Sequence, residues 1–137
     1  MTNHAYFNLD GYDSGAIHNQ VLWIDADTMN EYDADMIPTG KILPVQGTPY
    51  DYTTPKAIGK DFDSDPETEK QAGGYDNNYI FNDYDGQLRL RVSLYSPASG
   101  IEAGTYQSAM HRHLYGKHAE PELCTIYKIA TRTIALG

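Results

Sequence analysis

The chain has 137 residues, of which 40% are hydrophobic and 21% charged, as expected for one globular domain large enough to bury a core. Its net charge of −9 argues against a nucleic-acid partner, because phosphate binding requires clustered Lys and Arg side chains. There is no apolar run long enough for a membrane span and no N-terminal secretory signal, and the lone Cys124 excludes an internal disulfide. These features predict a cytoplasmic protein without membrane partners, and they leave its oligomeric state open.

Alternating hydrophobic residues predict two strands, over residues 22–26 and 88–95, each with one buried face. The expected buried side chains are Leu22, Ile24, Ala26, Leu88, Leu90, Val92 and Leu94. Asp85-Gly86, just before the second segment, predicts a hairpin turn. Residues 27–36 could hold a short helix that ends before Pro38. Twelve tyrosines, twelve glycines and seven prolines favour short strands joined by turns, so the predicted fold class is all-β, as a β-sandwich.

Residues 37–51 contain three prolines and therefore cannot form a central strand along their length. Gly40 and Gly47 offer corners with positive φ. We expect this segment to be a rigid, extended lining whose geometry is fixed before a ligand arrives, although a structural crossover loop would have the same composition.

The segment at residues 2–9, TNHAYFNL, places His4 among amide and aromatic side chains. An imidazole exchanges protons near neutral pH, amides hydrogen-bond to hydroxyl groups, and aromatic rings pack against the flat face of a sugar. The pattern suggests proton transfer on a polyhydroxylated ligand.

Several motifs together resemble one family. The segment TNHAYFNL is followed by IDAD at 24–27, IPTGKILPVQGTPYD at 37–51, GGYDNN at 73–78 and SPASGI at 96–101. Their order and spacing are similar to those of the aldose 1-epimerases (galactose mutarotases). The resemblance is strongest over residues 2–101, whereas residues 102–137 diverge.

This resemblance implies a β-sandwich of the galactose mutarotase type and an isomerase that interconverts the α and β anomers of aldohexoses by acid/base ring opening. His4 matches the family's acid, which protonates the ring oxygen, and Asp76 matches the aspartate that binds sugar hydroxyls. Asn3, Tyr6 and Asn77 are expected to line the substrate site. The implied substrate is a sugar of the galactose or glucose type, and neither a cofactor nor a metal is required.

Two departures from the family bear on activity. Family members usually have a long N-terminal half, so residues 1–137 are expected to form a single, partial domain. The family's catalytic base is a glutamate in a Cys-x-Glu context, and the similar stretch here has Ile126 at that position. Losing a general base typically costs about 10²- to 10⁴-fold in rate. We therefore expect weak or no activity from this chain alone, and the alternative function is a non-catalytic carbohydrate-binding domain.

A third hypothesis is a structural β-domain with a metal site. His111 and His113 would share a strand face, and Glu120 or Cys124 could complete a zinc set. The acidic segment 61–70 resembles a calcium loop only in part, because Pro66 takes the place of the required glycine. We expect no metal at either place.

Overall fold

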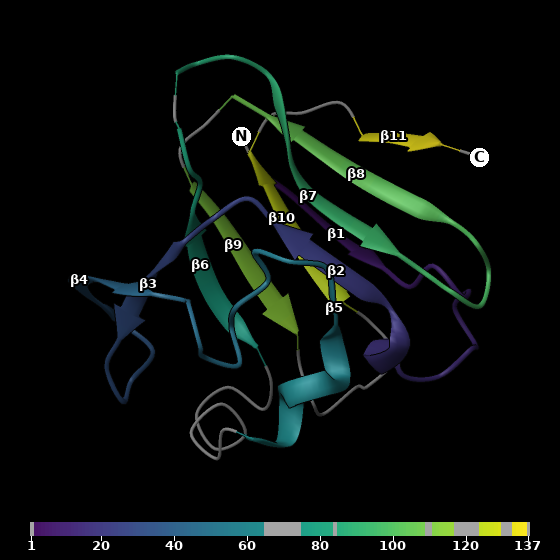
Figure 1. The fold of residues 1–137 in the computed structure, drawn as a ribbon, viewed down its shortest axis with the longest axis horizontal. Coiled ribbons are helices and arrows are strands. Elements are labelled where there is room, and N and C mark those ends of the chain that lie inside the picture. The colour runs from purple at the N-terminus through teal and green to yellow at the C-terminus, as the bar shows by residue number, and fades with distance from the viewer. Residues whose placement is uncertain are drawn as a thin grey trace.

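The computed structural model is a sandwich of two antiparallel β-sheets with a shared core (Figure 1). It describes the backbone of residues 2–64, 75–83, 85–108, 111–116, 124–129 and 133–136, and the side chains of residues 6–62, 75–83 and 85–108. The all-β prediction is confirmed, since short 3₁₀ turns are the only helical elements among the described residues. No helix in these segments is long and apolar enough to cross a membrane.

Both sheets combine strands that are distant in the sequence. The six-stranded sheet has the order β1 (Thr2–Phe7), β10 (Cys124–Ile129), β9 (His111–Gly116), β6 (Asp76–Ile80), β3 (Thr28–Tyr32) and β4 (Pro38–Pro44). The five-stranded sheet has the order β11 (Thr133–Leu136), β8 (Glu102–Gln107), β7 (Arg89–Tyr95), β2 (Val21–Ile24) and β5 (Lys56–Ala57). Two 3₁₀ segments, η1 (Ile17–Asn19) and η2 (Ile58–Ser64), lie outside the sheets.

The core lies between the sheets and confirms most of the predicted buried faces. Leu22, Ile24 and Ala26 are buried on and just after β2, and Val92 and Leu94 are buried on the neighbouring β7. From the six-stranded sheet, the core receives Met29 of β3 and Tyr79 of β6.

The prediction for residues 88–95 was wrong at Leu88 and Arg91, and Leu90, which was expected to be buried, is only half-buried. Leu88 precedes β7 and is 61% exposed, so it does not belong to the buried face. Arg91 was assigned to the solvent side but is buried, with 1% exposure. The register of β7 on β8 shifts between Leu90 and Val92, and a bulge of this kind puts the extra residue out of the simple alternation.

The predicted helix at residues 27–36 is also wrong, because this segment contains β3 and a turn. Met29 faces the core while β4 and β6 bond to the two edges of β3, and this pairing overrides the weak local helix signal. The turn that follows is stabilised by Asp33, whose carboxylate accepts the backbone N–H groups of Asp35 and Ile37.

The predicted hairpin at Asp85-Gly86 is a connection of another kind. Gly86 has the expected positive φ of 75°. However, β6 before it and β7 after it belong to different sheets, so the turn is part of a crossover between the two layers.

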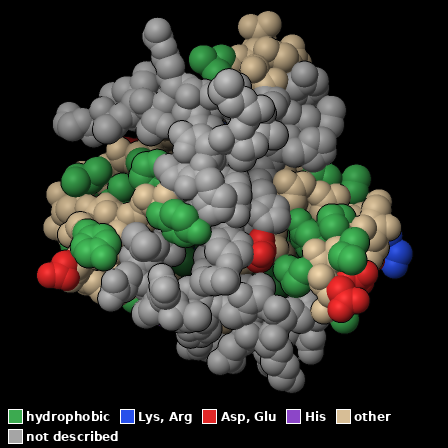
Figure 2. All heavy atoms as spheres, turned by 180° about the vertical axis from the view of Figure 1, so that it is seen from behind, with side chains coloured by type: hydrophobic (Ala, Val, Ile, Leu, Met, Phe, Trp, Pro, Cys, Tyr) green, Lys and Arg blue, Asp and Glu red, His purple; other side chains and the backbone are tan. Residues whose placement is uncertain are grey.

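The proline-rich segment confirms the expectation that it is not a central strand. β4 lies at the edge of its sheet and begins and ends with proline. An edge strand has a neighbour on one side only, so the N–H groups that the prolines lack are not needed for pairing on the other side. Gly40 and Gly47 have positive φ values of 88° and 74°. Exposed Ile42 lies on this strand beside Lys41, which pairs with Glu31 at 3.3 Å. Figure 2 shows hydrophobic and acidic side chains together on the flank that β3 and β4 form.

Candidate functional site

The two faces of β6 have different surroundings. Tyr75, just before the strand, and Tyr79 are buried in the core, whereas Asp76 and Asn78 alternate with them and are half-buried. Because successive residues of a strand point to opposite faces, Asp76 and Asn78 lie on the outer face of the six-stranded sheet. The predicted binding residue Asp76 therefore faces away from the core.

The strand register aligns Tyr6 with Asp76. Tyr6 is opposite Thr125, Thr125 is opposite Tyr115, and Tyr115 is opposite Asp76, so the four positions form one row across β1, β10, β9 and β6. Tyr6 is 50% exposed, which agrees with its place on the outer face. Three strand spacings separate the ends of the row, or about 14 Å between Cα positions. A monosaccharide and the side chains that hold it would fit within this span.

His4 and Asn3 are described through their backbone only, as members of β1 opposite Tyr127 and Lys128. Their side chains lie outside the described residues. Period-two alternation assigns position 4 to the same face as Tyr6, and position 3 to the face of Phe7, which packs against the core. The register thus places positions 4, 6 and 76 on one face and position 3 on the other.

Asn77 is on the face opposite to Asp76. Its side-chain amide contacts the sulfur of Met29 at 3.8 Å, and its side-chain oxygen is buried. The structure therefore does not bring Asn77 together with Tyr6 and Asp76.

Position 126, where the family has its glutamate, is described by its register alone. Ile126 is opposite Ala5 on one side and Leu114 on the other. This row alternates with the row of Tyr6, so position 126 belongs to the face opposite to position 4. Glu120 and Glu122, which could act as alternative bases, lie outside the described residues.

Three residues that the sequence reading missed, Asn30, Tyr32 and Asn78, extend the outer face beyond Asp76 toward β3. The side-chain amide of Asn78 donates to the side-chain oxygen of Asn30 on β3 at 2.5 Å. Burial raises the pKa of Tyr32, the negative charge of Asp76 raises it further, and a backbone hydrogen bond from Asn78 opposes the shift. No motif marks Asn30 or Tyr32, and the helix expected over 27–36 would have separated them from β6. A correct β3–β6 pairing was the signal needed to find them.

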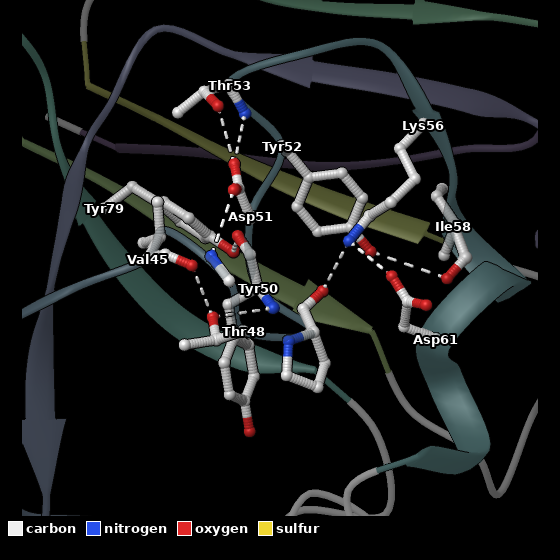
Figure 3. A network of polar contacts seen from close by, with 12 residues as sticks. Val45, Thr48, Tyr50, Asp51, Tyr52, Thr53, Lys56, Ile58, Asp61 and Tyr79 are labelled. Atoms are coloured by element: carbon white, nitrogen blue, oxygen red, sulfur yellow. Dashed lines mark hydrogen bonds and ion pairs between the residues drawn. The ribbon is translucent and has the colours of Figure 1, made fainter.

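The segment after β4 is held by its own polar contacts, as Figure 3 shows. The Asp51 carboxylate accepts the backbone N–H of Gly47 at 3.3 Å and both the hydroxyl and the backbone N–H of Thr53, at 2.6 and 3.1 Å. The pKa of Asp51 is lowered, chiefly by the Thr53 hydroxyl. This network fixes the end of the segment that we expected to be a rigid lining.

Lys56 holds the same loop from the other side. Its ammonium donates to the carbonyl of Pro49 at 2.9 Å and to the carboxylate of Asp61 at 2.8 Å, and it lies 4.6 Å from the centre of the Tyr52 ring. In Figure 3, Lys56 and Asp61 point toward one another from β5 and η2.

Two open hollows flank this loop, with volumes of about 390 and 380 Å³. The first is lined by Asp27, Thr28, Pro44, Val45, Gln46, Asp51 and Thr53, and the second by Gly47, Thr48, Pro49, Asp51, Thr54, Lys56 and Asp61. Neither lining includes Tyr6 or Asp76, so these hollows are separate from the outer-face row.

Among the residues whose side chains are described, no three His, Cys, Asp or Glu side chains cluster in a way that could hold a metal ion. Asp61, the first residue of the partial calcium motif, is instead the partner of Lys56. The side chains of the other hypothetical ligands, which are Asp63, Asp65, His111, His113, His118, Glu120 and Cys124, lie outside the described part of the chain.

Comparisons with known proteins show the family of the chain. A family model described as aldose 1-epimerase matches residues 1–130. The galactose mutarotase of Homo sapiens is 39% identical over 79 residues, which cover 58% of this chain and 22% of that protein. The aldose 1-epimerase of Escherichia coli (strain K12) is 30% identical over 115 residues, which cover 84% of this chain and 33% of that protein.

Solved structures show the same fold. A GalM/aldose epimerase homologue from C. elegans has a TM-score of 0.74 at 26% identity, covering 92% of this chain and 40% of that one. A galactose 1-epimerase from Lactobacillus acidophilus NCFM has a TM-score of 0.72 at 21% identity, covering 92% of this chain and 38% of that one. The chain thus spans less than half the length of each of these relatives. Over that span, the family match and the mutarotase-type sandwich show that it belongs to the aldose 1-epimerase family.

Proposed function

We propose that the outer face of the six-stranded sheet binds an aldohexose of the galactose or glucose type and takes part in the interconversion of its α and β anomers. The register that aligns Tyr6 with Asp76, and assigns position 4 to the same face, carries this proposal. Membership of the aldose 1-epimerase family supports the class of reaction.

Anomer exchange requires ring opening, rotation about the C1–C2 bond, and closure on the other face. Opening needs an acid that protonates the ring oxygen and a base that takes the proton of the anomeric hydroxyl, and closure reverses both transfers. In the proposal His4 is the acid, because an imidazole can hold or release a proton near neutral pH. Asp76 binds sugar hydroxyls, and Tyr6 offers a ring to the sugar face.

The catalytic base is the least supported part of this acid/base mechanism. Ile126 cannot accept a proton, and its row belongs to the opposite face of the sheet. A sugar-binding domain with little or no catalysis is therefore the second candidate function. Proton transfer by water in place of a positioned carboxylate would leave the rate about 10²- to 10⁴-fold below that of a complete site.

Polarimetry and a binding titration on the same protein distinguish these functions. Freshly dissolved α-D-galactose or α-D-glucose is followed to equilibrium with and without protein, and sugar binding is measured by NMR chemical-shift changes. Faster equilibration that is lost in His4→Gln supports the enzyme, and binding without acceleration supports the second candidate. If the protein neither binds the sugar nor accelerates equilibration, the proposal is contradicted, and a structural β-domain is the remaining hypothesis.

Matched variants locate the effect. Asp76→Asn is expected to weaken sugar binding, whereas Asp13→Asn makes the same change at an exposed turn and is expected to have no effect. His18→Gln is the control for His4→Gln, because the His18 ring packs 5.1 Å from Phe62 near η1 and η2. A cytoplasmic location is also proposed, from the single cysteine of the chain.

A further inference from the structure

We propose that Asn30, Tyr32 and Asn78 form one wall of the sugar site, called here the β3 wall, and that this wall contacts the sugar hydroxyls at C3 and C4. The inference rests on the proposed function, since it extends the same site beyond Asp76. It assigns Tyr32 as a residue that positions the sugar and influences the choice between galactose and glucose, which differ at C4.

The pairing of β3 with β6 places the wall. Thr28 is opposite Ile80 and Met29 is opposite Tyr79, so Asn30 and Tyr32 follow on β3 while Asn78 and Asp76 precede on β6, at the same end of the paired segment. The 2.5 Å hydrogen bond between the Asn78 and Asn30 side chains shows that these two residues do meet on the outer face. Asp76 therefore has the row of Tyr6 on one side and the β3 wall on the other.

Tyr32 lies within range of the negative charge of Asp76. Its hydroxyl oxygen accepts the backbone N–H of Asn78, and the charge of Asp76 adds to burial in raising its pKa. The phenol thus stays neutral at cellular pH and keeps its hydroxyl group. The register of β3 on β4 shifts between Asn30 and Tyr32, and such a bulge redirects the side chains next to it.

The chemistry of the wall suits a polyol. The Asn78–Asn30 hydrogen bond uses neither the amide nitrogen of Asn30 nor the side-chain oxygen of Asn78, and among residues with described side chains no other hydrogen bond to these two atoms is seen, so a donor and an acceptor are offered to hydroxyl groups. The Tyr32 ring adds an apolar face, on which the C–H groups of a pyranose can pack.

The order of the strands determines which hydroxyls the wall would contact. β1, with position 4, lies three strands from β6, and β3 lies on the far side of β6. If the residue at position 4 protonates the ring oxygen, the β3 wall faces the opposite side of the pyranose ring. C3 and C4 carry their hydroxyls on that side. Galactose and glucose would then present different C4 hydroxyl directions to Tyr32 and the amide pair.

The first test needs no sugar. In protein labelled with ¹³C at the tyrosine Cζ, an alkaline NMR titration gives the pKa of Tyr32, whose resonance is assigned with Tyr32→Phe. Asp76→Asn removes a charge that raises this pKa, so the pKa is expected to fall toward its ordinary value. An unchanged pKa would mean that the charge of Asp76 does not act on Tyr32 and would overturn the inference.

The second test measures binding of D-galactose, D-glucose and 3-deoxy-D-glucose to the unmodified chain and to Tyr32→Phe. Loss of the Tyr32 hydroxyl is expected to weaken binding of the preferred hexose about three- to tenfold, to change the galactose-to-glucose ratio, and to change 3-deoxy-D-glucose binding least. Tyr95→Phe, at the exposed end of β7 in the other sheet, is the matched control and is expected to bind as the unmodified chain does. Urea unfolding of both variants checks that the fold is kept.

The outcomes separate the two proposals. If the unmodified chain binds hexoses and Tyr32→Phe keeps both the affinity and the ratio, the β3 wall is refuted while the proposed function stands. If the unmodified chain binds none of the three sugars, the proposed function fails and the wall with it. A changed ratio together with the fall in the pKa supports the wall.

Discussion

The guanidinium of Arg91 forms an ion pair with the carboxylate of Asp25 next to the core, linking β7 to the residue just after β2. The Arg91 side chain is 2% exposed and that of Asp25 is 25% exposed. Arg91 also donates to the carbonyl of Asn82 at 2.7 Å and lies 5.6 Å from the centre of the Phe81 ring. A bulged residue that sequence periodicity assigns to solvent is therefore a buried cation with several partners.

Removing the carboxylate of this pair is predicted to destabilise the fold strongly. Asp25→Ala leaves a buried guanidinium without its counter-ion, and we expect the free energy of unfolding to fall by about 3 kcal/mol. Arg91→Met should cost less, about 1–2 kcal/mol, because Asp25 is partly exposed and can be hydrated. Urea denaturation followed by circular dichroism measures both. Arg89→Met, which breaks the exposed pair with Asp85, is the control and should change little; an equal loss there would contradict the prediction.

Lys56 is predicted to anchor the loop before β5. Lys56→Met removes one donor to the Pro49 carbonyl and one to the Asp61 carboxylate, so we expect a loss of about 2 kcal/mol in the free energy of unfolding. Amide hydrogen exchange at Asp51, which donates to Thr48 within the loop, should become faster. Lys60→Met makes the same change at an exposed lysine and should stay within about 0.5 kcal/mol of the unmodified chain. Equal effects of the two changes would argue against the anchor.

Asp51 makes the stability depend on acidity. Hydrogen bonds, that of the Thr53 hydroxyl first, lower its pKa in the folded chain from the ordinary 3.8. A carboxyl whose folded pKa is depressed contributes stability above its unfolded pKa and loses that contribution as the pH falls through the folded pKa. Asp51→Asn should therefore reduce stability at neutral pH and flatten the loss between about pH 5 and pH 2. Urea midpoints measured across this range test it, and parallel curves for the two proteins would contradict it.

Gly59 is predicted to tolerate no side chain. A Cβ atom added there would lie 2.6 Å from the Cβ and 3.1 Å from the carbonyl oxygen of His18, neither of which can move without shifting the backbone. Gly59→Ala should destabilise the fold by about 2 kcal/mol, through overpacking of η1 against η2. At Gly104 the nearest atom is the mobile Leu90 Cδ1, at 3.1 Å, so Gly104→Ala should cost less. Thermal unfolding ranks the two variants, and the reverse order would show that His18 yields more easily than the packing indicates.

Local sequence features predicted the elements wherever short-range chemistry decides the structure. Leu22 and Ile24 alternate as a strand with one buried face requires, and they lie in the core. Gly40 and Gly47 adopt the positive φ values for which glycine is suited, and the prolines of β4 confine it to an edge. The failures came where long-range pairing prevailed, at the helix expected over 27–36 and at the hairpin expected before β7.

The site shows the same division between local and long-range information. The motifs around His4 and Asp76 carry the family resemblance, because they are short and ordered along the chain. They could not show that Tyr6 and Asp76 stand in one row, that Asn77 faces the core, or that the charge of Asp76 acts on Tyr32.

By itself, the sequence determined an all-β chain and its membership of the aldose 1-epimerase family, since strand periodicity, turn residues and motif order are local properties. The tertiary structure alone decided which residues share the outer face and that Arg91 is buried. The physical reason is that strand partners are chosen by packing and register between distant segments, and a shift of one residue moves every side chain of a strand to the other face.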